Sequence, residues 1–329
     1  MATTSSNSSG TTTPAMQQGD GGYGLAVIGC GTMGIAVLSG ILDTQRSLSS
    51  SGGRQAALDN LSQSVESIDN PEDLTHLPTR YYACVSRPES GKRLRRDVFS
   101  ENEWPQVQVV VGENVRAARE ADVVMLGCKP NMVEDILKEE GMHEALRGKM
   151  LVSICAGLRI EQMQGWVGKE TTVIRAMPNT PSKIREGMTI LSPVPSSSPP
   201  ISSHILLSLF SSIGRCRFLP EKHFDACTAL AGSGPAFACV FLEAMADGAV
   251  MMGLPRKEAV ELAAQTMQGA ARMVLQSGSH PAQIKDSVTT PGGCTIAGLL
   301  ALEDGKVRST VARTIQAAAE HAAGLGQKK

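Results

Sequence analysis

Short apolar runs alternate with helix-like segments through the first half of the chain. Such runs recur over 23–28, 81–85, 107–111, 123–128, 150–154, 172–176 and 188–191. Segments with helical spacing of apolar residues lie between most of them. Because strands that alternate with helices form parallel sheets, the pattern predicts an α/β domain with a doubly wound, mostly parallel sheet.

The pattern changes after a stretch rich in proline and serine, PVPSSSPP at residues 193–200. Beyond it, apolar residues follow helical spacing almost throughout, and Ala, Leu and Met dominate. Linkers of this composition commonly separate domains. We therefore predict a sheet-containing domain over 22–194 and an all-helical domain over 195–329.

Two segments do not fit this periodic pattern. Residues 1–21 are polar and lack both the apolar and the basic region of a targeting sequence, so we predict a disordered tail. Residues 44–78 are rich in Ser, Asn, Asp and Gln without sustained periodicity. This composition predicts a low-complexity surface insertion that adds little to the core.

The composition is that of an ordinary globular protein with about two domains, at roughly 150 residues per domain. The 329 residues include 19% charged and 42% hydrophobic side chains, with a net charge of −1. Because no overall field favours polyanions, we expect neither nucleic-acid nor membrane binding. Eight cysteines without a C-x-x-C pair indicate reduced, buried thiols and a cytoplasmic protein. The uncharged stretch 226–242 contains GSGP, which predicts the start of a buried helix and not a membrane span.

The first candidate site is the hexapeptide GCGTMG at 29–34, which follows an apolar run and leads into a helix-like segment. In a G-x-G-x-x-G turn, the first glycine allows the tight turn and the second admits a pyrophosphate. The third lets the helix pack on the sheet, and helix N–H groups face the phosphates. The segment predicts a dinucleotide site, and the alternative is a merely tight strand-to-helix turn.

The end of the second strand indicates which dinucleotide binds. An acidic residue there would bond the ribose 2′-hydroxyl, but this strand ends in Val85, Ser86 and Arg87. We therefore expect NADPH, with Ser86 and Arg87 on the 2′-phosphate, although NADH remains possible. The basic residues at 92, 93, 95 and 96 are interpreted as a solvated helix face.

Other catalytic signatures do not occur. The sequence has no P-loop and no G-x-S-x-G elbow, and its six histidines show no metal-ligand spacing, so we predict no metal site. The chemistry is therefore expected to come from the cofactor.

Two further turns are unusual. RAMPNTP at 175–181 follows a predicted strand and contains two prolines, which cannot donate the hydrogen bonds that would continue the strand. The resulting loop lies at the edge of the sheet where ligands bind. In VTTPGGCTI at 288–296, two glycines allow a flexible turn just before a helix. Successive backbone N–H groups of this turn could point together and bind a carboxylate. The alternative for Thr295 in this segment is a plain helix N-cap.

Together these segments resemble the pyrroline-5-carboxylate reductase family, in order over about residues 23–325. The resemblance rests on GCGTMG, on CKP at 128–130, on RAMPNTP, on AGSGPA at 231–236 and on VTTPGGCTIAGL. Its most specific part is the D-x-V-x-x-P-G-G-x-T pattern that begins at Asp286.

The resemblance implies reduction of 1-pyrroline-5-carboxylate to L-proline by hydride transfer from NAD(P)H. It also implies a Rossmann-like domain followed by an all-α domain that interlocks with a second subunit. Matching positions would hold the pyrophosphate (Gly29, Gly31, Thr32, Met33, Gly34), the adenosine end (Ser86, Arg87, Asn114), the nicotinamide (Lys129, Pro130, Ala156, Gly157, Asn179) and the substrate (Gly292, Gly293, Cys294, Thr295).

This chemistry suits the residues. A protonated cyclic imine needs no strong side-chain acid, only a bound carboxylate, an oriented ring nitrogen and a hydride aimed at the ring. Thr295 is the hypothesised catalytic residue, as an orienting hydroxyl. Alternatives are reduction of another cyclic imine and a non-catalytic NADPH-binding regulatory protein. A β-hydroxyacid dehydrogenase is disfavoured because its K-x-x-x-N pattern does not occur.

The helices predicted over 236–253 and 256–276 carry apolar residues on more than one face, together with small residues that permit close approach. This pattern favours burial between the subunits of a dimer or higher homo-oligomer. The alternative is an ordinary buried helix in a monomer.

Overall fold

A computed structural model describes residues 22–65 and 70–324. The predicted tail at 1–21 lies outside the described residues. The chain divides into two compact units, the first extending to Phe224 with a C-terminal return from Ala323, and the second comprising Asp225–Ala322.

The first unit contains an eight-stranded sheet in the order β3-β2-β1-β4-β5-β6-β7-β8. The strands are β1 (Gly24–Ile28), β2 (Arg80–Val85), β3 (Val107–Val111), β4 (Val123–Leu126), β5 (Met150–Ser153), β6 (Thr172–Met177), β7 (Gly187–Leu191) and β8 (Gly214–Phe218). All neighbours pair in parallel except β6 and β7, which are antiparallel. The predicted Rossmann-like, mostly parallel sheet is confirmed.

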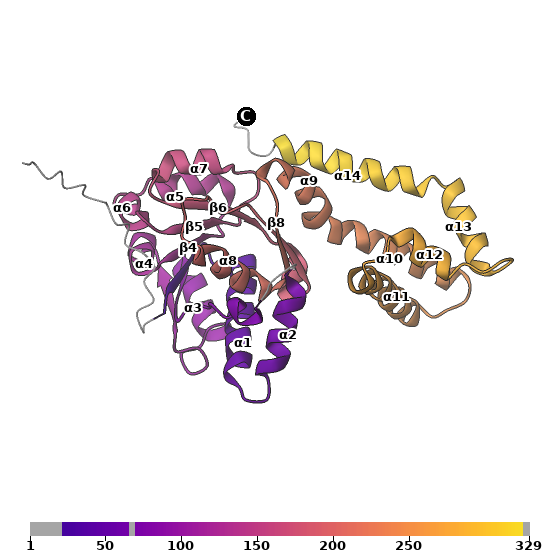
Figure 1. Ribbon diagram of the computed structural model, residues 1–329, viewed down its shortest axis with the longest axis horizontal. Coiled ribbons are helices and arrows are strands. Elements are labelled where there is room, and N and C mark those ends of the chain that lie inside the picture. Colours follow the sequence, from indigo (N-terminus) through magenta and orange to yellow (C-terminus); the bar gives the residue numbers. More distant parts are fainter. Residues whose placement is uncertain (1–21, 66–69, 325–329) are drawn as a thin grey trace, which may run out of the picture. The chain divides into compact units, whose positions relative to one another are not determined.

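Helices cover both faces of this sheet (Figure 1), and each face has its own hydrophobic core. Along β1, Leu25 and Val27 join one core, while Ala26 and Ile28 join the other, as the two-residue period of a strand requires. The first core also takes residues from α1 (Thr32–Ser49), α2 (Arg54–Ser64), α3 (Pro88–Asp97) and α8 (Ile201–Ser211). The second takes residues from α4 (Asn114–Glu120), α5 (Val133–Leu137), α6 (Met142–Leu146) and α7 (Ile160–Val167).

The predicted insertion at 44–78 is not a surface excursion. Helix α1 continues to Ser49, and the segment then forms α2 and a 3₁₀ turn, η1 (Pro71–Leu74). Six of its apolar side chains are buried in the core that α1 and α8 share: Leu48, Ala57, Leu58, Leu61, Leu74 and Leu77. The prediction was wrong because these few residues are scattered among many polar ones, so the short α2 shows no sustained period in the sequence.

The boundary between the units also differs from the predicted 194/195. Helix α8 and strand β8 follow the proline- and serine-rich stretch but pack in the first unit, and β8 extends the sheet beside β7. Strand β8 was missed because its sequence, GRCRF, carries Arg215 and Arg217 and has no apolar run. The division therefore falls after Phe224.

The second unit is all-helical, as predicted. It contains α9 (Phe224–Cys227), a π-helical turn η5 (Thr228–Gly232), α10 (Gly234–Met251), α11 (Arg256–Ser277), α12 (Pro281–Ser287), α13 (Cys294–Asp304) and most of α14 (Val307–Gly324). Its buried apolar cluster consists of Ala246, Ala259 and Ala263, where α10 packs on α11.

The helical run Glu221–Met251 is long and apolar enough to cross a membrane by length and composition, with a mean hydropathy of 1.4, but a single such helix is weak evidence. The stretch was predicted to start a buried helix. Within one copy of the chain, however, only 11% of its most apolar window is buried. Its apolar side chains are therefore not covered by the chain's own fold.

Candidate active site

The three glycines of the turn between β1 and α1 have three different surroundings. Gly29 has a φ of +84°, and a Cβ there would lie 2.5 Å from the backbone nitrogen of Cys128. A Cβ on Gly34 would lie 3.0 Å from Val27, where α1 packs on the sheet. A Cβ on Gly31 would meet only the Gly29 carbonyl oxygen, at 4.0 Å. The first and third glycines are therefore required by packing, whereas the second leaves open space above the turn.

Helix α1 begins at this open space. Its N-cap, Gly31, provides no side-chain hydrogen bond, and the Gly31 carbonyl accepts from the Ile35 N–H at 2.8 Å. The first-turn N–H groups of Thr32, Met33 and Gly34 have no partner within the helix by geometry, and the helix dipole favours an anion there. Burial raises the pKa of the neighbouring Cys30 thiol to about 12, so no thiolate opposes an anion. These residues fit a dinucleotide pyrophosphate.

The residues expected at the adenosine end follow β2 and β3. Ser86 and Arg87 are exposed, and Arg87 is the N-cap of α3. The Gly112 N–H donates to the Val85 carbonyl at 3.0 Å, which joins the ends of the two strands ahead of Asn114, the first residue of α4. The arrangement brings these three residues to one edge of the sheet.

Two neighbouring arginines of α3 are already engaged. Arg95 donates to the Val109 carbonyl at 2.7 Å, and Arg96 pairs with Asp97 at 2.6 Å. Among the ion pairs found between described residues, none involves Arg87. Arg87 is thus free to meet a phosphate in a way that Arg96 is not.

The residues expected around the nicotinamide lie at the carboxyl ends of three adjacent strands. Lys129 and Pro130 follow β4, Ala156 and Gly157 follow β5, and Asn179 follows β6. Because β1, β4, β5 and β6 run parallel and lie side by side in this order, their carboxyl ends meet at the edge that carries the glycine turn. The side-chain oxygen of Asn179 accepts from the Met188 N–H at 2.9 Å, so this side chain also fixes the start of β7.

A partly buried ion pair between Arg175 and Glu221 was not anticipated. The Arg175 side chain is 9% exposed, donates to Glu221 at 2.8 Å and lies 4.6 Å from the centre of the Phe224 ring. Glu221 also accepts from the Ile160 N–H at 2.9 Å. The pair ties β6 to the start of α7 and to the last residues of the first unit. The sequence signal that could have revealed this ion pair is an arginine inside an otherwise apolar strand.

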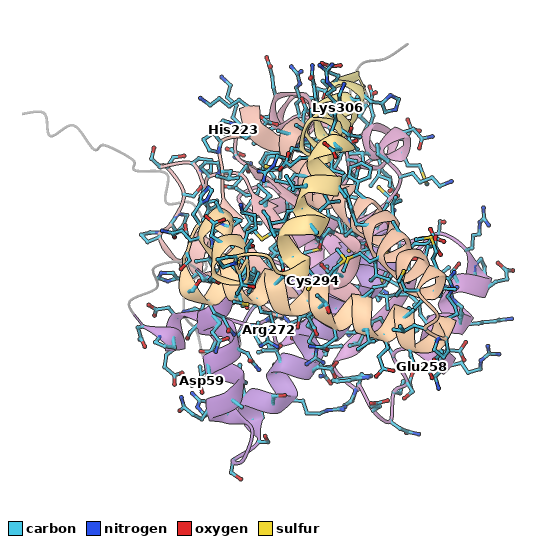
Figure 2. All side chains as sticks on the ribbon, turned by 90° about the vertical axis from the view of Figure 1, so that its right-hand side faces the viewer. Asp59, His223, Glu258, Arg272, Cys294 and Lys306 are labelled. Atoms are coloured by element: carbon cyan, nitrogen blue, oxygen red, sulfur yellow. The ribbon has the colours of Figure 1, made fainter. Side chains whose placement is uncertain are left out.

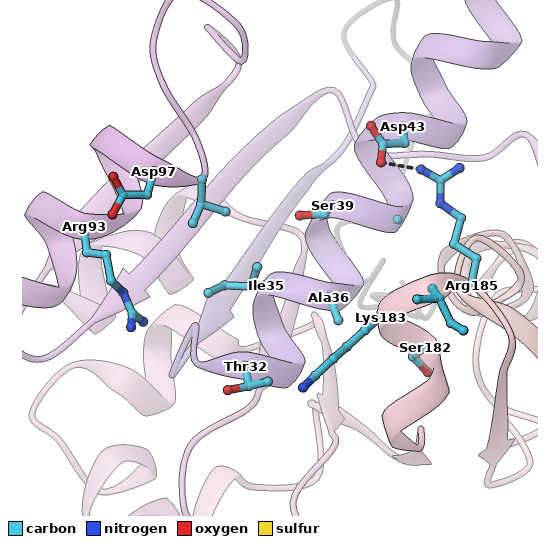
Figure 3. A pocket seen from close by; sticks show the side chains of 13 residues that line it. Thr32, Ile35, Ala36, Ser39, Asp43, Arg93, Asp97, Ser182, Lys183 and Arg185 are labelled. Carbon is cyan, nitrogen blue, oxygen red and sulfur yellow. Dashed lines mark hydrogen bonds and ion pairs between the residues drawn. The ribbon is translucent and has the colours of Figure 1, made fainter. Parts of the chain in front are cut away.

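A cavity of about 540 Å³ begins at Thr32 and follows α1, between α3 and the 3₁₀ turn η3 (Thr180–Ile184). Figure 3 shows the side chains that line it. Arg93 and Lys183 reach into it, and Arg185 pairs with Asp43 at its far side. No sequence signal indicates this cavity, since its lining comes from three separate segments.

The turn expected to bind substrate lies in the second unit, before α13. Gly292 has a φ of +68°, and a Cβ on Gly293 would lie 2.6 Å from the Thr290 hydroxyl, so both positions require glycine. Figure 2 labels Cys294, the first residue of α13, whose N-cap is Gly293. Thr295 is therefore one residue inside the helix, and the hypothesis that it is an N-cap is wrong. Thr295 is half-buried and belongs to the first turn of α13, whose N–H groups have no partner within the helix.

The remaining titratable groups of the described residues form no metal site. Within the described residues, no group of three or more His, Cys, Asp or Glu side chains is placed to hold a metal ion. His280 is the N-cap of α12, a structural role. All eight cysteines are free, and only four are buried: Cys30, Cys84, Cys155 and Cys216. The expectation of buried thiols thus holds for half of them.

Family models and known proteins match both units of the chain. Residues 221–325 match the family model described as pyrroline-5-carboxylate reductase dimerisation, and residues 24–157 match the model described as NADP oxidoreductase coenzyme F420-dependent. A pyrroline-5-carboxylate reductase from Lophium arboricola is 50% identical over 320 residues, covering 92% of this chain and 93% of that protein. One from Schizosaccharomyces pombe is 45% identical over 308 residues, covering 92% and 99%.

Solved structures agree. The Coxiella burnetii pyrroline-5-carboxylate reductase has a TM-score of 0.74 at 25% identity and covers 93% of this chain and 99% of its own. The Plasmodium falciparum pyrroline carboxylate reductase, solved with NADP bound, has a TM-score of 0.71 at 25% identity and the same coverage. The chain belongs to the pyrroline-5-carboxylate reductase family.

Proposed function

We propose that this protein reduces 1-pyrroline-5-carboxylate to L-proline with NAD(P)H, the last step of proline biosynthesis. The observation that carries the proposal is the presence of both half-sites. The first unit has an open glycine turn at an uncapped helix start, and the second has the Gly292–Gly293 turn ahead of another uncapped helix. Family membership and the activities named for its relatives support the same reaction.

NADPH, when bound, supplies the hydride. In this proposal the first-turn N–H groups of Thr32, Met33 and Gly34 hold the pyrophosphate, and Gly31 leaves room for it. Ser86 and Arg87 bind the 2′-phosphate, with Asn114 near the adenosine. The residues after β4, β5 and β6, namely Lys129, Pro130, Ala156, Gly157 and Asn179, line the nicotinamide end. NADH can use the same site but gains nothing from Arg87.

Substrate recognition is assigned to the turn before α13. The backbone N–H groups from Gly293 to Thr295 lie at a helix start and suit the substrate carboxylate. The Thr295 hydroxyl orients the ring nitrogen, which is already protonated in the reactive iminium. A neutral hydroxyl suits this role because a strong acid is not needed.

We also propose a cytoplasmic dimer or larger homo-oligomer assembled through the second unit. The apolar faces of α10, α11 and α13 support it, as does the match of residues 221–325 to a dimerisation model. Fractionation of cells with a marker enzyme checks the compartment, and light scattering checks the assembly.

The central test is NADPH oxidation by the purified protein with 1-pyrroline-5-carboxylate, beside other cyclic imines at equal concentration. We expect the highest kcat/KM with 1-pyrroline-5-carboxylate and proline as the product. Preference for another imine would reassign the substrate. NADPH binding without turnover on any imine would instead favour the regulatory alternative, and oxidation of hydroxyisobutyrate with NADP+ would favour a hydroxyacid dehydrogenase.

A further inference from the structure

Two cysteines occupy matched positions at the ends of adjacent strands. The parallel register of β4 and β5 pairs Leu126 with Ser153. Two residues further along, this register places Cys128 opposite Cys155, and the Ile154 N–H still donates to the Leu126 carbonyl at 2.9 Å. Adjacent strands lie about 4.8 Å apart, which is within the Cα separation that a disulfide spans.

The two cysteines are in contact. The sulfur of Cys155 donates to the carbonyl oxygen of Cys128 at 3.2 Å. Hydrogen bonding by the Cys155 side chain lowers the pKa of Cys128 below its usual value, and the same interaction together with burial raises the pKa of Cys155. Cys128 is half-buried, whereas Cys155 is buried. The pair therefore combines an accessible, more acidic thiol with a protected partner, the usual arrangement of an attacking and a resolving cysteine.

The pair lies beside the glycine turn. A Cβ on Gly29 would come within 2.7 Å of the Cβ of Cys128, so little space separates Cys128 from the β1–α1 turn. Cys128 directly precedes Lys129, and Cys155 directly precedes Ala156. Movement of either cysteine thus shifts the loop that follows it, and these two loops flank the nicotinamide end in the proposed function.

We propose that Cys128 and Cys155 form a reversible disulfide when the protein meets a peroxide, and that this disulfide weakens NADPH binding. The Cys128 thiolate attacks one peroxide oxygen and gives a sulfenic acid, and the other oxygen leaves as water after protonation. The Cys155 sulfur then attacks the sulfenic sulfur, and the hydroxyl leaves as a second water. Two thiols lose two electrons and two protons, and hydrogen peroxide is reduced to two waters.

The effect on NADPH rests on the proposed function, but the disulfide itself does not. Because the disulfide would shift the loops at the nicotinamide end, NADPH binding and oxidation oppose each other. By linkage, the factor by which oxidation weakens NADPH binding equals the factor by which NADPH disfavours the disulfide.

The test treats the reduced full-length protein with hydrogen peroxide, blocks remaining thiols with N-ethylmaleimide and maps peptides by mass spectrometry. We expect a Cys128–Cys155 cross-link that dithiothreitol removes and that saturating NADPH suppresses. We expect NADPH affinity, followed by its fluorescence, to fall at least about tenfold in the oxidised protein, as for a typical coupled pair of events. Cys239→Ser removes an exposed thiol on α10 and serves as the matched control, which should oxidise normally.

Cys128→Ser should abolish the cross-link and preserve NADPH affinity after peroxide treatment. Cys155→Ala should leave a sulfenic acid at Cys128 that dimedone traps. Absence of the cross-link in the wild-type protein would overturn the proposal, as would equal loss of NADPH affinity in wild type and Cys128→Ser. Failure of the reduced protein to turn over 1-pyrroline-5-carboxylate would contradict the proposed function while leaving the cross-link result intact.

Discussion

The two units of this protein bury their apolar residues in different ways. The first unit encloses two hydrophobic cores, one on each face of its sheet. The buried cluster of the second unit contains three alanines. Among the described residues, the large apolar side chains left exposed lie mainly in the second unit, including Val240, Phe241, Met245, Leu262 and Leu300.

This difference shows that the two units depend on different partners for stability. The first unit covers its strands with its own helices and can be stable by itself. The second unit exposes an apolar surface that an isolated soluble domain rarely carries, and such a surface marks an interface. The small residues of α10 that permit close approach are therefore suited to contacts with a second copy of the chain.

The largest expected effect comes from separating the two units. Residues 22–224 alone should unfold cooperatively, with a free energy of unfolding of about 5–15 kcal/mol, as for an ordinary domain. Residues 225–322 alone should show no cooperative unfolding as a monomer. Circular dichroism melting with light scattering measures both, and a cooperative, monomeric second unit would remove the distinction.

Substitution of a buried leucine within residues 44–78 tests whether this segment is part of the first hydrophobic core. Leu61 is 2% exposed, and Leu61→Ala should lower the free energy of unfolding by about 2–5 kcal/mol, the usual cost of removing a buried leucine side chain. Gln63→Ala, on an exposed face of the same helix, should be nearly neutral. Equal effects of the two substitutions on the free energy of unfolding would indicate that residues 44–78 add little to the core.

The corresponding substitution in the second unit should act on assembly. Leu300 is 59% exposed in a single copy, so Leu300→Ala should change the melting temperature mainly at low protein concentration, where the oligomer dissociates. Melting at two concentrations a hundredfold apart separates this effect from a loss of intrachain packing, which would be independent of concentration.

Arg87→Ala tests the cofactor site of the first unit. The variant should raise the KM for NADPH by about 10- to 150-fold and leave that for NADH nearly unchanged, because a charge-assisted contact contributes about 1.5–3 kcal/mol and NADH has no 2′-phosphate. Arg96→Ala, whose guanidinium already pairs with Asp97, is the matched control. Equal losses with both cofactors would contradict the assignment.

Thr295→Ala tests the substrate site of the second unit and has the smallest expected effect. Turnover should fall by more than about tenfold, which corresponds to roughly 1.4 kcal/mol lost from the transition state. The melting temperature should stay nearly unchanged because Gly293 and not Thr295 is the N-cap. NADPH affinity should also be unchanged, and Thr295→Ser should restore most activity. If Thr295→Ala has the turnover of the wild-type protein, the Thr295 hydroxyl has no catalytic role, and only the backbone groups of the turn are left to bind substrate.

Much of the fold could be predicted because strong local signals agree. Seven of the eight strands, the glycine turn and the all-helical second unit follow from apolar periods that need no distant partner to be recognised. Strand β8 and helix α2 could not be found this way. Each carries polar residues at its exposed positions and buries only a few side chains, and those are buried only because the neighbouring elements lie there.

The candidate site also combines features that local sequence predicts with features that depend on distant segments. By itself the sequence determined the residue types, since a G-x-G-x-x-G turn after a strand and a P-G-G turn before a helix are recognised within a few residues. Only the tertiary structure decided which segments meet. It joined Arg175 to Glu221, placed Cys128 opposite Cys155, and set Gly293 as the cap of α13. Such pairings depend on strand register and helix packing, in which residues far apart in the chain are brought into contact by burial of apolar surface elsewhere.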